Sequence, residues 1–319
     1  MYQAVLGGQV VASFEDTPIM ASSIKDGDLA LQFVDGTENE GAPYGFAVFS
    51  EDSQELLDMF NAGLADIKKA LQEAEGDHDK AVEILRKRGQ AIAAKRSERT
   101  AEQGCVLAKY EDGFAAIVAL KCETDFVSAT DGFRGVTEGI LDVAMKNKPK
   151  SLEELLTLTM DNGHTVEAEV TQQSGVTGEK VELGHYEFIE APHTYGYIHP
   201  GNMLAAIAGF NIEPSEKMAN EICMQIASMN PVAIMPEGVT EEIRQRELEI
   251  ARDKAREQGK PENLLDRIAE GSLNKYFKEN CLLMQESILD SKKTVEQILK
   301  SENKELTVVD FKRVNLNKD

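Results

Sequence analysis

The chain has 319 residues, with 34 basic and 56 acidic side chains and a formal net charge of −22. This acidic excess excludes a protein that coats nucleic acid, because contact with phosphates requires a basic surface. With 42% hydrophobic residues, the composition is that of a globular protein, and the length predicts two domains or three small ones. No run approaches the ~18 apolar residues of a membrane span, and the first residues lack the basic flank of a secretory signal. We therefore expect a cytoplasmic protein with no membrane partner.

The cysteines and histidines show no spacing that is typical of a metal site. The cysteines are Cys105, Cys122, Cys223 and Cys281. The histidines are His78, His164, His185, His193 and His199. Scattered cysteines in an intracellular chain are more often small buried residues than nucleophiles. We expect no metal, no cofactor and no hydrolytic centre.

Residues 1–52 differ from the rest in charge and in pattern. They hold one base and nine acidic residues, a net charge of −8. Apolar residues alternate with polar ones in two stretches: Leu29, Leu31 and Phe33, then Phe46 and Val48. A period of two broken by turn residues predicts a small β-meander. We treat residues 1–52 as an acidic, β-rich extension of unknown role.

From residue 53 the apolar period becomes that of helices. Breaks at Asn61-Ala62-Gly63 and Gly76-Asp77, and an end at Gly89, predict three short helices over residues 53–90. A unit of this size buries little apolar surface, so we expect an accessory module.

The chain has one basic run, which follows and overlaps this module: Arg86, Lys87, Arg88, Lys95, Arg96 and Arg99. One interpretation is a contact with phosphate or with an acidic partner. The other, which the residues by themselves favour, is a solvated linker helix. We assign residues 91–103 as a basic linker.

The centre of the chain contains an internal duplication. Apolar stretches on either side of Asp112-Gly113 predict one β-hairpin, and those on either side of Gly201-Asn202 predict another. An amphipathic helix follows each hairpin and ends near Pro149 or Pro231. We expect an α+β fold with two similar core subdomains, residues 104–190 and residues 191–238.

The C-terminal third is rich in helix-forming and charged residues. Two thin apolar seams joined at Gln258-Gly259-Lys260-Pro261 predict an antiparallel coiled-coil hairpin over residues 239–280, which projects from the body. Residues 281–319 hold a predicted helix and a final strand, which we expect to return to the second subdomain.

A large apolar side chain stands at the junction between the first hairpin and its helix, in Lys121-Cys122-Glu123-Thr124-Asp125-Phe126-Val127. In one interpretation Phe126 folds back into the local core and Asp125 caps the helix. In the other, Phe126 points outward as a wedge for a partner. The residues alone favour the first.

Several stretches resemble the bacterial translation elongation factor Ts family. They are Gly63-Leu64-Ala65-Asp66-Ile67-Lys68-Lys69-Ala70-Leu71-Gln72-Glu73-Ala74-Glu75-Gly76-Asp77, Lys95-Arg96, Cys122-Glu123-Thr124-Asp125-Phe126-Val127 and Lys292-Lys293-Thr294-Val295. The resemblance runs from about residue 53 to the C-terminus and includes the duplicated core and the helical hairpin. The Thr-Asp-Phe-Val match is short but specific, because it falls at the predicted strand-to-helix junction. Residues 1–52 have no counterpart in the family pattern.

The resemblance implies a guanine-nucleotide exchange factor that releases GDP from elongation factor Tu and is not an enzyme. Residues 53–90 would form a module similar to ubiquitin-associated domains. The implied insertion into the nucleotide domain of elongation factor Tu, which helps to dislodge Mg²⁺, involves Thr124, Asp125, Phe126 and Val127. Additional implied contacts with elongation factor Tu are His199, Leu64, Ala65, Lys68 and Arg96.

Two hypotheses compete with exchange. The first is a non-catalytic adaptor that binds partners through the acidic extension and the helical arm. The second is an enzyme that uses Cys122 with His199; it is the weakest, because the sequence shows no third orienting group and no oxyanion motif.

Overall fold

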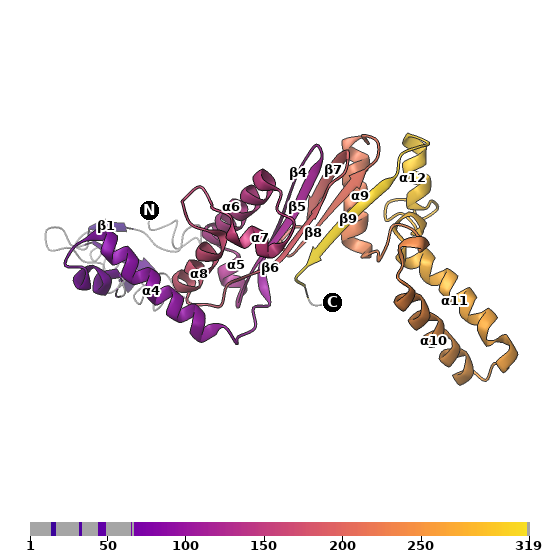
Figure 1. Cartoon of the computed structure of the whole chain (residues 1–319), viewed down its shortest axis with the longest axis horizontal. Helices are drawn as coiled ribbons and strands as arrows, with labels where there is room; N and C mark the ends of the chain where they lie inside the picture. The colour runs from indigo at the N-terminus through magenta and orange to yellow at the C-terminus, as the bar shows by residue number, and fades with distance from the viewer. Residues whose placement is uncertain (1–13, 17–31, 34–43, 49–64, 66, 318–319) are drawn as a thin grey trace. The chain divides into compact units, whose positions relative to one another are not determined.

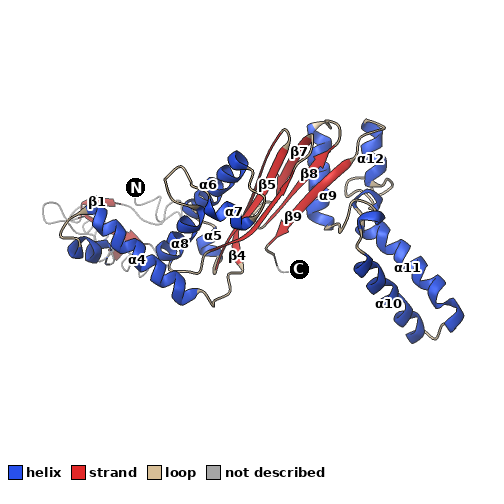
Figure 2. Ribbon diagram, viewed as in Figure 1, coloured by secondary structure: helices blue, strands red, loops and turns tan. Residues whose placement is uncertain are grey.

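The structure, a computed structural model, describes residues 14–16, 32–33, 44–48, 65 and 67–317. The chain divides into two compact units, Met1–Ala94 and Lys95–Asp319. Each unit is described by itself below. Figure 2 shows helices and strands together, so the predicted mixed α+β fold is confirmed.

In the first unit three short strands form an antiparallel sheet. They are β1 (Phe14–Asp16), β2 (Gln32–Phe33) and β3 (Tyr44–Val48). Their order is β1-β3-β2, so β3 pairs with both others. A meander would place β2 in the middle, and the predicted meander is therefore wrong. The longest strand occupies the central position, where both of its edges form ladder hydrogen bonds.

The helical part of the first unit is described from residue 65 onward. Residues 67–73 are helical, and α4 spans His78–Arg96. The predicted break between them is confirmed, since Glu75 and Gly76 have φ of 52° and 83°. Ala70, Ala74 and Ala81 form the small core between the helices. The first helix predicted for residues 53–90 lies outside the described residues.

The predicted end of this module at Gly89 is wrong, because α4 continues through it to Arg96. Gly89 is buried, and the next residues include Ala91, Ala93 and Ala94. Alanine is the strongest helix former, and a single glycine inside a helix costs only about 1 kcal/mol. The helix therefore also covers the first part of the predicted linker, residues 91–96.

The second unit is built on two three-stranded antiparallel sheets. The first contains β4 (Gln103–Glu111), β5 (Phe114–Cys122) and β6 (Glu182–Ile189), in the order β4-β5-β6. The second contains β7 (His193–Ile198), β8 (Leu204–Phe210) and β9 (Val308–Asn315), in the order β7-β8-β9. Both predicted hairpins are confirmed, and each sheet adds a third strand beside the second strand of its hairpin.

The two sheets pack against each other, and this explains why β5 and β8 are apolar on both faces. Ala115, Ile117 and Ala119 of β5 share one core cluster with Ala205 and Ile207 of β8. The alternate residues of β5 face a helix layer instead. A strand that is buried on both sides shows a continuous apolar run rather than alternation.

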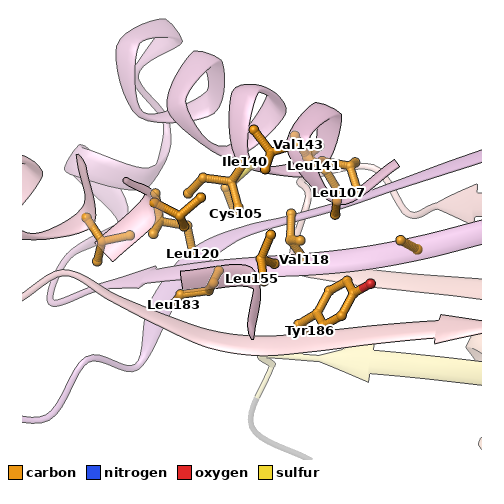
Figure 3. Packing of buried hydrophobic residues seen from close by; sticks show 14 of the residues in the cluster. Cys105, Leu107, Val118, Leu120, Ile140, Leu141, Val143, Leu155, Leu183 and Tyr186 are labelled. Atoms are coloured by element: carbon orange, nitrogen blue, oxygen red, sulfur yellow. The ribbon is translucent and has the colours of Figure 1, made fainter. Parts of the chain in front are cut away.

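Helices cover the outer faces of the sheets. They are α5 (Asp125–Ser128), α6 (Asp131–Asn147), α7 (Leu152–Thr157), α8 (Val166–Thr177) and α9 (Glu216–Met229). Figure 3 shows Ile140 and Leu141 of α6 against Leu107, Val118 and Leu120 of the first sheet. On the second sheet α9 has the same place, since its apolar face packs against Phe210 and its neighbours.

The predicted helical hairpin is formed by α10 (Glu241–Glu257) and α11 (Leu265–Asn280). The two helices lie side by side (Figure 1), joined by a turn in which Gly259 has φ of 70°. At the base of the hairpin Ala233, Val239, Phe277 and Cys281 form a buried cluster. Further short elements are η2 (Pro236–Gly238), η3 (Glu262–Leu264), η4 (Leu282–Met284) and α12 (Val295–Glu302). Among the helices described, none combines the length and the apolar character that crossing a membrane requires.

Candidate functional site

The segment between β5 and α6 presents one large apolar side chain to solvent. In the single turn of α5, Phe126 is 81% exposed, whereas Val127 is 7% exposed and belongs to the core under α6. The interpretation favoured from the residues alone, that Phe126 folds back into the core, is therefore wrong. Successive helical residues point about 100° apart, so one of the two faces the sheet and the other turns away from it. Val127 occupies the inner position.

Asp125 is not the helix cap that the sequence predicted. It is the first residue of α5, after Thr124 at the N-cap position, whose side chain makes no capping hydrogen bond. The longer helix α6 is capped by Thr130, whose hydroxyl accepts a hydrogen bond from the amide of Phe133 at 3.2 Å. A cap lies directly before the helix that it serves, and α5 separates Asp125 from α6. The Asp125 side chain is exposed, as is that of Phe126.

Hydrogen bonds close the turn at its C-terminal side. The amide of Ala129 and the hydroxyl of Ser128 donate to the carbonyl of Asp125, at 3.0 and 3.1 Å. The hydroxyl of Thr130 donates to the carbonyl of Val127 at 2.9 Å. A helix of four residues has little stability of its own. These bonds, with the burial of Val127, hold the direction in which Phe126 points.

At the N-terminal side, Glu123 ties the segment to two arginines. Its carboxylate accepts hydrogen bonds from Arg96 and Arg99, each at 2.9 Å, and from the amide of Lys180 at 2.6 Å. Burial acts to raise the pKa of Glu123, but the Lys180 amide and the two guanidinium groups outweigh it and hold the pKa at about 2. Arg96, a predicted partner contact, is thus engaged within the chain.

A second carboxylate, from Glu179, holds the same part of the segment. It accepts hydrogen bonds from the amides of Glu123 and Thr124, at 2.9 and 3.0 Å, and from the Thr124 hydroxyl at 2.6 Å. Glu179 was not among the site residues predicted from the sequence. It lies 55 positions from Thr124, and an acid just after a helix carries no local sign of what it contacts.

His199 lies in the turn between β7 and β8 and is exposed. Its Nδ1 is 3.0 Å from the hydroxyl of Tyr197. In the same turn the carbonyl of Asn202 accepts a hydrogen bond from the amide of Val106 at 2.6 Å. Gln103, three residues before Val106 in β4, pairs with Cys122, which lies two residues before Thr124. The His199 turn and the 124–127 segment therefore lie at the same end of the sheets.

The predicted contacts of the N-terminal module fall in the other unit. Ala65 and Lys68 are exposed. Leu64 lies outside the described residues.

The arrangement around Cys122 does not favour nucleophilic chemistry. Cys122 is fully buried, and its thiol lies 3.1 Å from the carbonyl of Thr124, to which it donates. Burial, with the charge of Glu179, raises the pKa of this thiol to about 12, so the reactive thiolate is disfavoured. Within the described part of the chain, no three or more His, Cys, Asp or Glu side chains are placed to hold a metal ion.

Comparison with known proteins identifies the family. A family model described as "Elongation factor TS" matches residues 123–318. The elongation factor Ts of Porphyromonas gingivalis is 56% identical over 273 residues, which cover 86% of this chain and all of the relative. The chain belongs to the elongation factor Ts family. The elongation factor Ts of Azobacteroides pseudotrichonymphae is 49% identical over 272 residues, which cover 85% of this chain and 99% of the relative. That of Bacteroides fragilis is 40% identical over 327 residues, with the same two coverages of 85% and 99%.

Membership in the elongation factor Ts family confirms the resemblance found in the sequence. The matched region begins at Glu123, so it takes in the 124–127 segment, strand β6 of the first sheet, the whole second sheet and the helical hairpin. The structure adds how this segment is held: Val127 in the core, Glu123 on two arginines, and Glu179 on two backbone amides. The chain is therefore a translation elongation factor with a braced, solvent-facing phenylalanine.

Proposed function

We propose that this chain is a guanine-nucleotide exchange factor that releases GDP from elongation factor Tu by presenting Phe126 to that protein's nucleotide-binding domain. Elongation factor Ts proteins exchange nucleotide on elongation factor Tu, so family membership supports both the activity and the partner. Exchange makes and breaks no covalent bond, and the chain is accordingly not an enzyme. Translation takes place in the cytoplasm, which is the expected location.

One observation carries the insertion step: Phe126 is 81% exposed on a turn that is fixed at both ends. Burial of an exposed phenylalanine in a partner's pocket is favourable, and a rigid one enters the pocket without losing much conformational freedom. Thr124, Asp125 and Val127 set its position, and Asp125 adds an exposed acid next to it.

The size of the effect follows from the burial of one aromatic side chain. Moving phenylalanine from water into a pocket contributes about 1.5–3 kcal/mol. Each ~1.4 kcal/mol corresponds to a factor of ten in affinity. Insertion of Phe126 by itself therefore accounts for a weakening of GDP binding by roughly 10–100-fold, and the rest of the interface must supply anything larger.

Displacement of Mg²⁺ would allow Phe126 to release GDP without touching the nucleotide. GDP is held through its phosphates and through a magnesium ion that bridges phosphate and protein oxygens. A wedge that shifts those oxygens weakens the whole site. Because coupling between two ligands is reciprocal, GTP or GDP that rebinds must in turn displace this chain from elongation factor Tu.

The remaining contacts and the division into domains are part of the same proposal. His199 is exposed at the end of the sheets that carries the segment and would touch the partner beside Phe126. Leu64, Ala65 and Lys68 would make a second contact from the module at residues 53–90, which we propose to be similar to ubiquitin-associated domains. Arg96 would act from the linker, where it holds Glu123.

We divide the second unit into a duplicated core and an arm. Residues 104–190 and 191–238 would be the two halves of the core, and residues 281–319 return to the second half, where β9 joins β8. Residues 239–280 would be the projecting arm. No role is proposed for residues 1–52.

Stopped-flow release of a fluorescent GDP analogue from elongation factor Tu tests this function. The unmodified chain is expected to accelerate release, and Phe126→Ala to lower the acceleration by roughly 10–100-fold. Ile250→Ala is a matched control, since Ile250 is also an exposed apolar residue, at 53%, but lies on α10. An unmodified chain without effect on release would refute the exchange function. An unimpaired Phe126→Ala variant would refute the role of Phe126.

A further inference from the structure

The carboxylate of Glu179 accepts three hydrogen bonds, and all three come from the residues at the start of the turn that carries Phe126. Oε2 accepts from the amides of Glu123 and Thr124, and Oε1 accepts from the Thr124 hydroxyl. Glu179 directly follows the C-cap of α8, Gly178, which is left-handed with φ of 69°, and its amide donates to the hydroxyl of Thr177 at 3.3 Å. The carboxylate therefore reaches the segment from a rigid helix end.

Residues 123–124 and residues 179–180 bind each other reciprocally. Glu179 accepts from the amides of Glu123 and Thr124, and Glu123 accepts from the amide of Lys180, the residue after Glu179. Each carboxylate thus accepts from backbone amides of the other segment, although the two segments are more than fifty positions apart in the sequence. Hydrogen bonds to a charged acceptor are roughly twice as strong as those between neutral groups. This clasp is formed by residues 123–124 and 179–180.

The clasp holds the residues just before α5 and is not a cap on the helix itself, since Glu179 accepts from the amides of Glu123 and Thr124. The first amides of a helix lack intrahelical partners, and a residue at the N-cap usually supplies an acceptor through its side chain. Thr124 stands at the N-cap of α5 and makes no capping bond, and its hydroxyl donates to Glu179. The backbone of Thr124 is extended, with φ of −122° and ψ of 155°. Glu179 holds the residue from which α5 starts in this conformation.

We propose that Glu179 is a positioning residue for nucleotide exchange: through Thr124 it orients the turn that presents Phe126. The inference rests on the proposed function, because it assigns Glu179 a part in the same insertion. A short turn that is anchored at its C-terminal side alone samples more directions, and ordering it on binding lowers both the affinity and the rate of productive insertion. Glu179 is not required to touch elongation factor Tu in order to act.

Three variants separate positioning from general stability. Glu179→Ala removes all three bonds, and Glu179→Gln keeps an amide oxygen that can still accept from the two backbone amides. Glu182→Ala is the matched control, since Glu182 pairs with Lys121 and Lys180 nearby but makes no bond to Thr124 or Phe126. GDP release from elongation factor Tu is measured as a function of factor concentration, which separates the maximal rate from the apparent affinity. Free energies of unfolding are measured in parallel.

Glu179→Ala is expected to lower the exchange efficiency by about tenfold, equivalent to the loss of one charge-assisted hydrogen bond. Glu179→Gln should recover much of this loss, and Glu182→Ala should exchange normally. In a Phe126→Ala background, Glu179→Ala should cause no further loss, because the side chain that it positions is gone. An equal loss in both backgrounds, or unchanged exchange by Glu179→Ala, would overturn the proposal.

Hydrogen exchange at the Thr124 amide gives a readout that does not depend on elongation factor Tu. Protection is expected in the unmodified chain and in Glu179→Gln, and it should fall in Glu179→Ala. Should Glu179→Ala fail to fold, Thr124→Val removes the hydroxyl bond alone and is expected to slow GDP release more mildly. Normal GDP release with this variant, together with normal GDP release with Glu179→Gln, would overturn the proposal. An unmodified chain that fails to accelerate GDP release would refute the proposed function, whereas an unprotected Thr124 amide would refute the positioning role.

Discussion

Phe126 and Val127 are neighbours in the chain whose side chains have opposite environments: Phe126 is 81% exposed and Val127 is 7% exposed. The buried valine anchors the turn in the core beneath α6, and the exposed phenylalanine is left for a partner. Val127 therefore serves the stability of the fold and Phe126 serves nucleotide exchange, so mutation of one residue at a time should separate the two properties.

Stability should depend on Val127 and hardly on Phe126. Val127→Ala removes two buried methyl groups and leaves a small cavity, so we expect a loss of about 2 kcal/mol in the free energy of unfolding. Phe126→Ala alters only exposed surface and should stay within about 0.5 kcal/mol of the unmodified chain. Urea unfolding followed by circular dichroism measures both. A larger loss for Phe126→Ala than for Val127→Ala would contradict the assignment.

The ion pairs of Glu123 should contribute stability that disappears in acid. Its pKa is about 2 in the folded chain, below the ordinary value of 4.5. Between these values the unfolded chain binds the proton and the folded chain does not, so the free energy of unfolding falls as the pH falls. The contribution is complete above pH 4.5 and is lost towards pH 2.

Glu123→Gln provides the comparison, because its side chain cannot titrate. The difference in unfolding free energy between the unmodified chain and Glu123→Gln should be greatest near neutral pH and should shrink as the pH is lowered from 4.5. Urea unfolding at a series of pH values measures this difference. A constant difference across that window would show that the carboxylate is not held ionised by Arg96, Arg99 and the Lys180 amide.

Two glycines in the second unit should respond to alanine in opposite ways. A Cβ at Gly104 would collide with the carbonyl oxygen of Leu120 and would lie 2.8 Å from the Leu316 side chain. We expect Gly104→Ala to destabilise the fold by about 1–3 kcal/mol. Gly135 lies exposed in the interior of α6, and a Cβ there would meet nothing within 4 Å.

Gly135→Ala should therefore stabilise the chain by about 0.5–1 kcal/mol, through helix propensity alone. Thermal unfolding of the two variants beside the unmodified chain tests both expectations. A stabilising Gly104→Ala would mean that β4 and β5 are not as close at this register as the structure places them.

The cysteines should be unreactive in the folded chain. All four are buried, and burial raises the pKa of each thiol, to about 12 for Cys122 and Cys223. A thiol-specific reagent should label none of them within minutes in buffer and all four in denaturant, since the thiolate is the reactive species. Exchange activity should survive the treatment of the folded protein. Loss of activity in step with the labelling of Cys122 would revive the hypothesis of a nucleophilic role.

Deletion of residues 1–52 should leave nucleotide exchange intact. The 124–127 segment and the groups that brace it all belong to the unit Lys95–Asp319, which has its own core. The shortened chain is expected to release GDP from elongation factor Tu at the rate of the full chain. A strong loss of exchange, or recovery of a different main partner only with the full chain, would instead favour the adaptor hypothesis.

The sequence by itself determined the local features of this protein. Apolar stretches on either side of Asp112-Gly113 and Gly201-Asn202 located both hairpins, because strand-forming residues and turn chemistry act over a few residues. The same holds for α12, which was predicted within residues 281–319 and which in the structure begins at a capping box formed by Thr294 and Gln297. Several short stretches, Thr-Asp-Phe-Val among them, together indicated the family, since motifs in the expected order need no knowledge of distant contacts.

Only the tertiary structure decided which way Phe126 points and what holds it there. A phenylalanine and a valine in one turn compete for a single inner position, and the space beneath α6 selects Val127. The clasp between residues 123–124 and 179–180 joins groups more than fifty positions apart. Such a pairing depends on how α8 and β5 are brought together, because a carboxylate's partner is set by proximity in space and leaves no periodic trace in the chain.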